Sequence, residues 1–539
     1  MRILFVMASP EYLRFYDSAV RGLAERGHDV LLAVNQQQDE KPVRLEELGS
    51  PERIRILGLV PPRGDAWYPM ARAVRGTMDY LRYLHPRYAD APALRTRLAR
   101  KGLPYRLRGI DTRLGVWTPR SVDRAIRGLA AVETGIPPSA SIGAFLDEHR
   151  PDIVIVSPLV DVASDQVDVV RAARQRGIRV AVAVASWDNL TNKGLLRVQP
   201  DALLVWNEAQ KREAAELHGV PPERVVVTGA QLFDKWFQRT PSRSLDAFAS
   251  DVGLRRADRF LLFTGSSMFI SAPEKEVPFV QRWVAAVRSS PHAALRDVPI
   301  LVRPHPYNGW IWADVDMSGF ADVAVWPRGK YNPVDAANRN DFFDSLYYSR
   351  AVVGINTSAM IEAAIIGRPV HSIVTGDFAS TQEGTLHFHH LLPENGGFLQ
   401  VGRGFDHHLE LLAASLADEA AARAQTERFV SWFLRPRGLD RDCTPIFAEG
   451  VEQAAGWPVV APERAGVMRA VAWLLRPVIA VLAHRPAKAS DRQRRALRKQ
   501  LDAANRRARK RIDKTTKITV KRLQRVRKAV AGRLRAFGV

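Results

Sequence analysis

Residues 344–370, DSLYYSRAVVGINTSAMIEAAIIGRPV, indicate the fold most clearly. Residues 351–354 form a short apolar run typical of a buried strand, and residues 359–366 have the composition of a helix that ends at Gly367. A second strand begins at Val370. The order strand, helix, strand predicts a parallel sheet with helices packed on its faces.

The turn between this strand and helix carries side chains that suit a phosphate and a sugar. Thr357 and Ser358 stand at the predicted helix N-terminus, where free N–H groups and the helix dipole favour anions. Glu362 lies one turn further along, within reach of a ribose. An ordinary α/β turn with a hydroxyl cap and a solvated Glu explains the same residues, so the neighbouring loops must decide.

The alternation of strands and helices extends over most of the chain in two series. Short apolar runs predict the strands, and apolar residues at helical spacing predict the helices. The expected strands are 2–6, 28–34, 153–157, 180–184, 202–206, 225–228, 260–263, 300–302, 324–326, 351–354 and 370–373, and the expected helices are 15–26, 165–176, 208–217, 276–288, 359–366, 407–432 and 445–456.

These two series predict an α/β protein with two doubly wound, Rossmann-like domains and a cleft between them. We expect the first domain at residues 1–240, with inserted helices at about 60–135, and the second at 241–456. Tyrosines and arginines of the insertion could contact an anionic or sugar acceptor, or simply pack the helices. A basic, helical C-terminal segment is expected at 462–539.

Composition indicates a soluble globular protein whose charge is concentrated at one end. The chain has 539 residues, 46% hydrophobic and 25% charged, and a net charge of +22. Residues 485–539 hold 21 Lys or Arg and three Asp, so they carry 18 of these charges and residues 1–484 carry +4. The basicity therefore belongs to the C-terminal segment.

The single cysteine, Cys443, excludes an intrachain disulfide and a Cys-based zinc cluster. The N-terminus lacks the long apolar region and cleavage site of a signal peptide, and no run of 18 apolar residues is present. We therefore expect a cytoplasmic protein.

Two further loops follow predicted strands of the second series, where an open sheet binds its ligand. Residues 264–267 read TGSS, and Ser266 and Ser267 offer hydroxyls where a Gly allows close backbone approach to a phosphate. The motif RPHP carries Arg303 and His305 in a loop restricted by two prolines. Both side chains can donate hydrogen bonds to a diphosphate. A structural turn with a surface His explains the same motif.

A third loop, residues 376–390, carries Gln382 and three histidines, His387, His389 and His390. Clustered histidines suggest a metal site, but no carboxylate stands at a typical ligand spacing. We therefore expect neither a metal nor a cofactor.

The motif SWDNLTNKG, residues 186–194, follows a predicted strand of the first series. Asp188 could act as a general base, while Asn189 and Lys193 could bind the acceptor or a phosphate. A self-capped turn explains the same residues equally well. Glu11, in the loop after the first strand, is the rival base.

Taken together, residues 1–455 resemble the GT-B superfamily of nucleotide-sugar glycosyltransferases. The second half is most similar to the bacterial capsule and teichoic-acid branch, which is CDP-glycerol transferase-like. This resemblance implies donor-phosphate contacts for His305 of RPHP and Ser358 of NTS. It also implies a ribose contact for Glu362 of EAAIIGRPV and a place near the donor sugar for Gln382 of TQEGT. The chain departs from the branch at GIN, where teichoic-acid enzymes have TDYS.

The C-terminal segment predicts a membrane contact. Residues 466–483 form an amphipathic helix with Trp473 available as an interfacial anchor, and the polybasic residues behind it suit anionic lipid. A helix packed on the body with a solvated arm is the alternative. Nucleic-acid binding is disfavoured because no aromatic side chain occurs between Arg485 and Arg535 to stack on bases.

The function expected from these observations is transfer of a sugar from a nucleotide-sugar to a saccharide or lipid-linked acceptor in envelope polysaccharide synthesis, at the inner face of the plasma membrane. The first domain would hold the acceptor and the second the donor, without an essential metal. Two alternatives use the same fold: a polyol-phosphate (CDP-glycerol type) transferase and a sugar-nucleotide epimerase. A non-catalytic scaffold that binds nucleic acid or membrane is a further alternative.

Overall fold

The computed structural model describes residues 1–36, 52–109, 115–329 and 335–484. Residues 1–480 form one compact unit, and of the second unit, residues 481–539, only 481–484 are described. The basic segment expected beyond residue 484 therefore lies outside the described residues.

The first sheet is entirely parallel, and its strands other than the edge strand at residues 54–59 are almost fully buried. Burial on both faces requires helices on both faces, which suits the apolar runs of this sequence. In the described part of the chain it has seven strands, in the order β3 (Ile54–Leu59), β2 (Asp29–Val34), β1 (Arg2–Met7), β4 (Ile153–Ser157), β5 (Arg179–Ala183), β6 (Ala202–Val205) and β7 (Val225–Val227).

The second sheet repeats this design. Its order, among the described residues, is β10 (Val323–Val325), β9 (Ile300–Arg303), β8 (Phe260–Thr264), β11 (Ser349–Gly354), β12 (Val370–Val374) and β13 (Leu399–Arg403), all parallel. Strand order reverses at β1/β4 in the first sheet and at β8/β11 in the second, and such points are where doubly wound sheets bind ligands. The expected α/β class with two doubly wound domains is confirmed.

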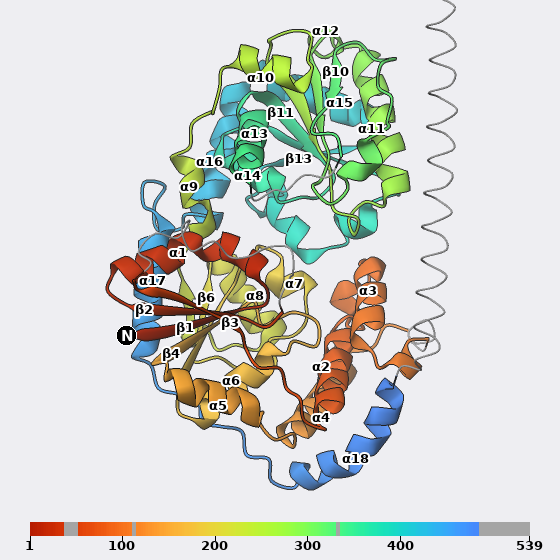
Figure 1. Cartoon of the computed structure of the whole chain (residues 1–539). Coiled ribbons are helices and arrows are strands. Elements are labelled where there is room, and N and C mark those ends of the chain that lie inside the picture. The colour runs from red at the N-terminus through yellow and green to blue at the C-terminus, as the bar shows by residue number, and fades with distance from the viewer. Residues whose placement is uncertain (37–51, 110–114, 330–334, 485–539) are drawn as a thin grey trace, which may run out of the picture. The chain divides into compact units, whose positions relative to one another are not determined.

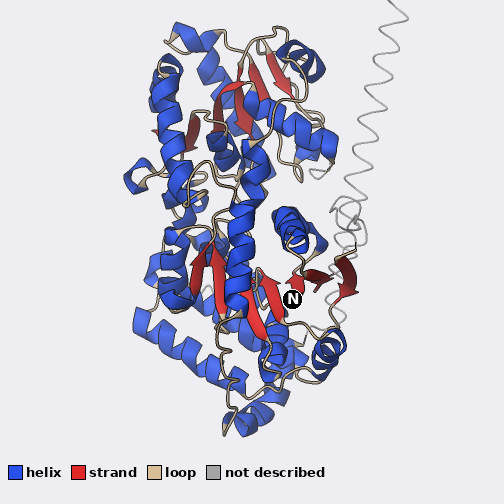
Figure 2. Ribbon diagram, turned by 90° about the vertical axis from the view of Figure 1, so that its left-hand side faces the viewer, coloured by secondary structure: helices blue, strands red, loops and turns tan. Residues whose placement is uncertain are grey.

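Helices cover both faces of each sheet (Figures 1 and 2). The first sheet and its loops are accompanied by α1 (Leu13–Glu25), α5 (Ala140–His149), α6 (Gln166–Gln175), α7 (Asn189–Asn192), α8 (Glu208–His218) and α9 (Asp234–Phe237). The second series contains α10 (Leu245–Val252), α11 (Pro273–Arg288), α12 (Ala293–Arg296), α13 (Ala336–Tyr347), α14 (Ala359–Ile365), α15 (Phe405–Ala417) and α16 (Glu419–Phe433).

After the second series the chain returns to the first sheet. Helix α17 (Cys443–Ala455) packs beside α1 and β5, and its Phe447, Val451 and Ala454 join the apolar core on that face. The domain limits at 240, 456 and 462 remain predictions.

The helical insertion expected at residues 60–135 contains α2 (Tyr68–Arg82), α3 (Pro92–Gly102) and α4 (Pro119–Thr134). Helices α2 and α3 meet where two glycines face each other, because a Cβ on Gly76 would lie only 2.1 Å from the carbonyl oxygen of Gly102. The tyrosines of this region, Tyr80, Tyr83 and Tyr88, are buried. Packing of the helices, rather than ligand contact, therefore explains these aromatic residues.

Several expectations about single elements were wrong. The helix expected at 407–432 is two helices, because Asp418 ends α15 and its carboxylate caps α16 by accepting from Ala421 N–H at 2.9 Å. Strands β3 and β13 were not expected: each lies at an edge of its sheet, and polar residues or Gly interrupt the apolar run in both, IRILGL and LQVGR.

The last described helix, α18 (Met468–Ala483), follows α17. Among the helices of the described residues, none is long and apolar enough to span a bilayer.

Candidate active site

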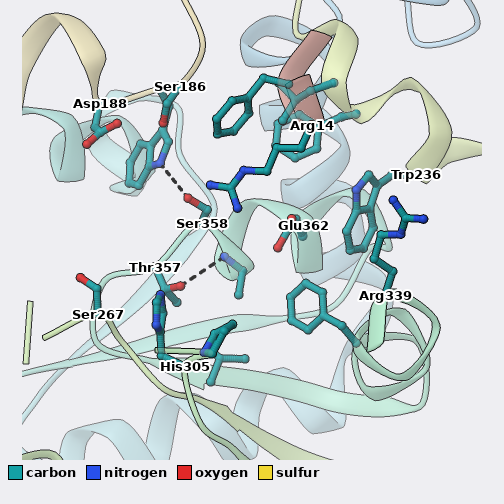
Figure 3. Close-up of a pocket in the computed structure, with 18 of the residues that line it drawn as sticks. Arg14, Ser186, Asp188, Trp236, Ser267, His305, Arg339, Thr357, Ser358 and Glu362 are labelled. Carbon is teal, nitrogen blue, oxygen red and sulfur yellow. Dashed lines mark hydrogen bonds between the residues drawn. The ribbon is translucent and has the colours of Figure 1, made fainter. Parts of the chain in front are cut away.

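A cavity of about 900 Å³ is lined by loops that follow strands of both sheets. Figure 3 shows Asp188 and Ser186 from the first series across from Ser358 and Glu362 of the second. The cavity is lined by seven of the residues expected from sequence: Asp188, Ser267, Arg303, His305, Thr357, Ser358 and Glu362. Glu11, Asn189, Lys193, Ser266 and Gln382 are not among its lining residues.

His305 lies in the cavity as a neutral hydrogen-bond donor. Burial, with a smaller contribution from the charge of Arg14, lowers its pKa to about 4. Its Nδ1 accepts from the backbone N–H of Tyr307 at 3.3 Å, which places the remaining ring proton on Nε2. At neutral pH, His305 can therefore donate one hydrogen bond from Nε2.

Arg303, the other basic residue of the RPHP motif, is held at the cavity wall. Its guanidinium donates to Ser345 Oγ at 3.0 Å and lies over the ring of Phe342, with Cζ 5.4 Å from the centroid. Only 2% of the residue is exposed. Its geometry ties β9 to α13 and leaves a positive charge beside the cavity.

The TGSS loop packs against the RPHP loop. A Cβ on Gly265 would lie 2.7 Å from the backbone N of His305, so the glycine is needed for close approach of the two loops. Ser267 lines the cavity, whereas Ser266 is fully buried. The backbone N–H of Ser266 donates to Glu276 at 2.8 Å, and burial raises the pKa of that carboxyl to about 7.

Thr357 and Ser358 face the cavity from the turn before α14 (Figure 3). Thr357 Oγ1 accepts from the backbone N–H of Ala359 at 3.5 Å. Ser358 Oγ accepts from the indole N–H of Trp187 at 3.4 Å, so this contact joins a loop of the first sheet to a loop of the second. Both hydroxyls keep capacity to donate to a ligand oxygen.

Glu362 is half-buried in the middle of the cavity, close to Arg14 (Figure 3). Burial raises its pKa to about 8, although the charges of Arg14 and Arg239 oppose this shift. The carboxyl is therefore largely protonated at neutral pH in the ligand-free protein, and it can both donate to and accept from a hydroxyl pair.

One end of the cavity was not expected from the sequence. Trp236 and Phe342 form an aromatic wall there, with centroids 5.9 Å apart, and Arg239 and Arg339 lie beside them. Arg14 was missed as well, although its position just after the first β-strand's loop is a signal of the kind used for the other loops. Trp236 lies in the short helix α9, beyond the turn at Gln231–Phe233 that follows β7, and its residue type alone does not mark a ligand contact.

Asp188 faces the cavity as a carboxylate. Burial favours its neutral form, but Lys193 and nearby groups that include a hydrogen bond from Ser186 and the charge of Arg97 outweigh burial and lower its pKa. An ionised carboxylate at neutral pH has the protonation state that a general base needs.

The other polar residues of this loop mostly serve the loop itself. Asn189 is buried and its Oδ1 accepts from the backbone N–H groups of Ala185 and Ser186 at 3.0 and 3.2 Å. Thr191 Oγ1 donates to the Asp188 carbonyl at 3.1 Å. Asn189 therefore has no access to a ligand, and the self-capped turn is the right description for it.

Helix α2 supports this loop from behind. Tyr83 donates its hydroxyl to the Lys193 carbonyl at 2.8 Å, and Arg82 donates to the Gly194 carbonyl at 2.9 Å. Asp79 accepts from the backbone N–H of Leu195 at 2.7 Å. The inserted helices thus hold the loop that carries Asp188.

Gln382 does not reach the cavity, in contrast to its expected place near a donor sugar. Its side chain is fully buried, and its amide donates to the carbonyls of Ile355 and Ile373 and to Ser372 Oγ at 3.0–3.2 Å. It braces the turn before Thr357, because backbone carbonyls left open by the strand ends need a buried donor.

The three histidines of the same loop point to different partners. His387 is buried against the Trp187 ring, with centroids 4.5 Å apart, and burial lowers its pKa to about 4. His389 bonds the Glu383 carbonyl, and His390 bonds Glu213. In the described part of the chain, no group of three or more His, Cys, Asp or Glu side chains is placed to hold a metal ion.

Glu11 lies apart from the lining residues of the cavity. Its carboxylate accepts from the hydroxyl of Tyr307 at 3.2 Å, which links the loop after β1 to the RPHP loop.

No protein-family model matches this sequence, and no curated protein matches it. Among solved structures, a UDP-GlcNAc 2-epimerase from Neisseria meningitidis bound to UDP-GlcNAc is similar in fold, with 11% identity and a TM-score of 0.47. That match covers 84% of this chain and 100% of the epimerase chain.

Two glycosyltransferases are also similar in fold. WaaG, involved in lipopolysaccharide biosynthesis, has 12% identity and a TM-score of 0.43 over 84% of this chain and 100% of its own. CalG4, the calicheamicin glycosyltransferase, has 14% identity and a TM-score of 0.41 over 84% of this chain and 98% of its own. At such identities the likeness concerns fold, and function has to be argued from this chain's residues.

Proposed function

We propose that this protein is a glycosyltransferase that moves a sugar from a nucleotide-sugar donor to an acceptor hydroxyl. The observation that carries the proposal is the cavity in which the carboxylate of Asp188, from the first series, faces the donor groups of the second series. Loops at the carboxyl ends of two doubly wound sheets meet there, as expected for a two-substrate site.

In this proposal the nucleoside diphosphate binds to the loops that follow the strands of the second sheet. The hydroxyls of Thr357 and Ser358 and Nε2–H of His305 donate to phosphate oxygens, and the charge of Arg14 lies nearby. Glu362 binds the ribose hydroxyls. The aromatic wall at Trp236 accepts the base by stacking.

The transfer step depends on Asp188, in the loop that follows β5 of the first sheet. The carboxylate of Asp188 takes the proton of the acceptor hydroxyl. At the same time the hydroxyl oxygen of the acceptor forms a bond to the sugar's anomeric carbon. The bond from that carbon to the phosphate oxygen breaks, and the nucleoside diphosphate leaves with the electron pair. His305 and the two hydroxyls stabilise the charge that develops on the leaving group. We expect turnover to persist in EDTA.

A ligand panel tests the proposal. Purified protein would be assayed by thermal shift and calorimetry against UDP-, GDP-, CMP- and dTDP-sugars and CDP-glycerol, followed by product analysis with saccharide acceptors. We expect one nucleotide class to bind and its sugar to be transferred. Binding of CDP-glycerol alone would instead assign polyol-phosphate transfer, as in the branch suggested by RPHP and NTS. Release of an epimerised nucleotide-sugar without transfer would assign an epimerase, and no binding at all would overturn an enzymatic role.

We further propose that the enzyme works at the cytoplasmic membrane surface on a lipid-linked or polymeric envelope acceptor. Helix α18 packs on the inserted helices through Ala472, which is fully buried, and through Arg476, whose Cζ lies 5.2 Å from the Trp67 centroid. On the rest of its surface, Trp473 and Leu474 are 61% and 64% exposed.

This exposed apolar side is immediately followed in the sequence by the segment with 18 excess positive charges. Apolar side chains that insert at an interface and basic residues that attract anionic lipid act as two signals on one chain. The combination supports a membrane, rather than nucleic acid, as the partner of this surface.

Vesicle sedimentation tests this part. We expect the full chain to sediment with vesicles that contain anionic lipid, less so at high salt, and Trp473→Glu and Leu474→Glu to weaken binding severalfold. Leu439→Glu, which adds the same charge at another exposed apolar position, is the matched control and should bind as wild type does. Sedimentation indifferent to lipid charge, together with tight, salt-sensitive binding to RNA or DNA, would overturn the membrane proposal.

A further inference from the structure

Arg97, on helix α3 of the inserted region, lies in the cavity wall outside the proposed donor contacts. Its guanidinium donates to the carbonyl oxygen of Asn192 at 2.5 Å and lies over the ring of Phe269, with Cζ 4.1 Å from the centroid. One contact comes from the first series and the other from the second. These contacts fix the side chain at the edge of the cavity next to Asp188.

The charge of Arg97 is not neutralised by an ion pair. Among the described residues no carboxylate lies within ion-pair distance of its guanidinium, although Arg63, Arg75 and Arg435 elsewhere in the chain are buried with such partners. Burial lowers the pKa of Arg97, and the more distant carboxylates offset only part of this. A half-buried cation of this kind is stabilised when an anionic ligand binds.

Two lysines extend the positive charge. Lys101 stands four residues after Arg97 and hence on the same face of α3. Burial and then the charges of Arg97 and Lys193 lower the pKa of Lys101. The guanidinium of Arg97 also bonds the carbonyl of Asn192, the residue before Lys193, so the three cations lie close together. The positive charge of Lys193 is partly neutralised by Asp161, because Lys193 Nζ lies 3.9 Å from Asp161 Oδ1.

Arg97 lies at the acceptor end of the cavity, whereas Lys101 and Lys193 are not among its lining residues and add charge beside it. Asp188 is at one side of the view in Figure 3, while Trp236 and Arg339, at the proposed nucleoside end, are at the other. Arg97 lines the cavity together with Asp188 and bonds the carbonyl of Asn192 in the same loop, which also carries Lys193. Both cations lower the pKa of Asp188. An anion bound there would therefore belong to the molecule whose hydroxyl Asp188 deprotonates.

We infer that Arg97, with Lys101 and Lys193, forms a subsite for a phosphate or diphosphate group carried by the acceptor. This inference rests on the proposed glycosyl transfer, and it narrows the acceptor to a phosphorylated one. A guanidinium binds such a group through paired N–H donors, whereas the lysines add charge.

Calorimetry on the full chain, with the nucleoside diphosphate of the donor panel present at saturation, tests the subsite. The probes are N-acetylglucosamine 1-phosphate, free N-acetylglucosamine, and the same sugar joined through diphosphate to a short prenyl lipid in micelles. We expect both phosphorylated probes to bind more tightly than the free sugar. Arg97→Ala should weaken them about 10- to 100-fold and Lys101→Ala severalfold.

Arg100→Ala, on the exposed side of the same helix, is the matched control and should match wild type. Nucleoside diphosphate affinity should stay within about twofold in all variants. Tighter binding of the lipid probe than of the soluble one would assign a lipid-borne group, and equal binding a soluble one. Equal affinity for phosphorylated and free sugar, or nucleotide binding weakened by Arg97→Ala, would overturn the subsite. If no nucleotide binds wild type, the donor site fails, and the phosphate comparison is made on nucleotide-free protein.

Discussion

Two loops at the carboxyl ends of parallel strands line the cavity from its two sides, and they use their polar residues differently. In residues 186–194, after β5, Asn189 and Thr191 bond the loop's own backbone, and Asp188 faces the cavity. In residues 355–358, after β11, both hydroxyls face the cavity.

The difference arises from which groups form hydrogen bonds with the backbone N–H and C=O groups of each turn. The loop after β5 has to cap itself, so its amide and hydroxyl are used for support. The turn after β11 is braced by a distant residue, because the Gln382 amide occupies the Ile355 carbonyl. A polar residue at a strand end is thus available to a ligand only when another group meets the backbone's needs.

The largest expected effect concerns two neighbours in the first loop. Asp188→Asn should lower turnover about 100- to 10,000-fold with donor affinity nearly unchanged, because it removes a general base while keeping the shape. Steady-state kinetics and calorimetry measure both quantities.

Asn189→Ala is the contrast, since it should lower stability through two lost backbone hydrogen bonds and leave the chemistry of the folded fraction intact. Near wild-type turnover in Asp188→Asn would transfer the role to Glu11.

The second prediction addresses the opposite loop and its neighbours. Glu362→Ala and His305→Ala should each weaken donor binding about 10- to 100-fold, the cost of losing a hydrogen bond to a charged group or to a buried hydroxyl pair. Calorimetry on folded variants measures this.

Gln382→Ala serves as the control for second-series residues that do not face the cavity. It should lower the melting temperature, since it leaves buried carbonyls without donors, and have little effect on donor affinity. Unchanged donor affinity in Glu362→Ala and His305→Ala would remove both residues from the site.

The smallest effect is a pH dependence of stability. The pKa of Glu362 is about 8 in the folded protein, above its ordinary value, so the folded state holds this proton more tightly than the unfolded state. Its contribution to stability is complete below the ordinary value and is lost as pH rises through about 8. We expect the melting temperature of ligand-free protein to fall between neutral and mildly alkaline pH, and to fall less in Glu362→Gln.

The pKa of Glu276 is raised as well, to about 7, so this residue also contributes to the pH dependence of the melting temperature. The difference in that dependence between wild type and Glu362→Gln isolates the contribution of Glu362. Identical slopes for the two proteins would mean that Glu362 ionises normally in the cavity. A nucleotide that binds the ribose site should abolish the difference.

Much of the site could be predicted because ligand loops of doubly wound sheets follow strand ends, and those strands are apolar runs. Thr357, Ser358, Glu362, His305 and Asp188 were found in this way. Trp236 could not be found, since it stands in a short helix that approaches the cavity only through tertiary packing. Arg97 was expected only as one of several arginines of the insertion that could contact an anionic acceptor. Asn189 and Gln382 have residue types that suit a ligand, but their buried partners decide otherwise.

The sequence by itself determined the two parallel sheets, because runs such as IVIVS are stable only when covered on both faces. It also determined that the positive charge is concentrated after residue 484. Only the tertiary structure decided that α17 returns to the first sheet, that the insertion supports the Asp188 loop, and which polar groups face the cavity. The reason is physical: periodicity records whether a residue is buried, whereas its partners are set by which segments, distant in sequence, satisfy each buried polar group.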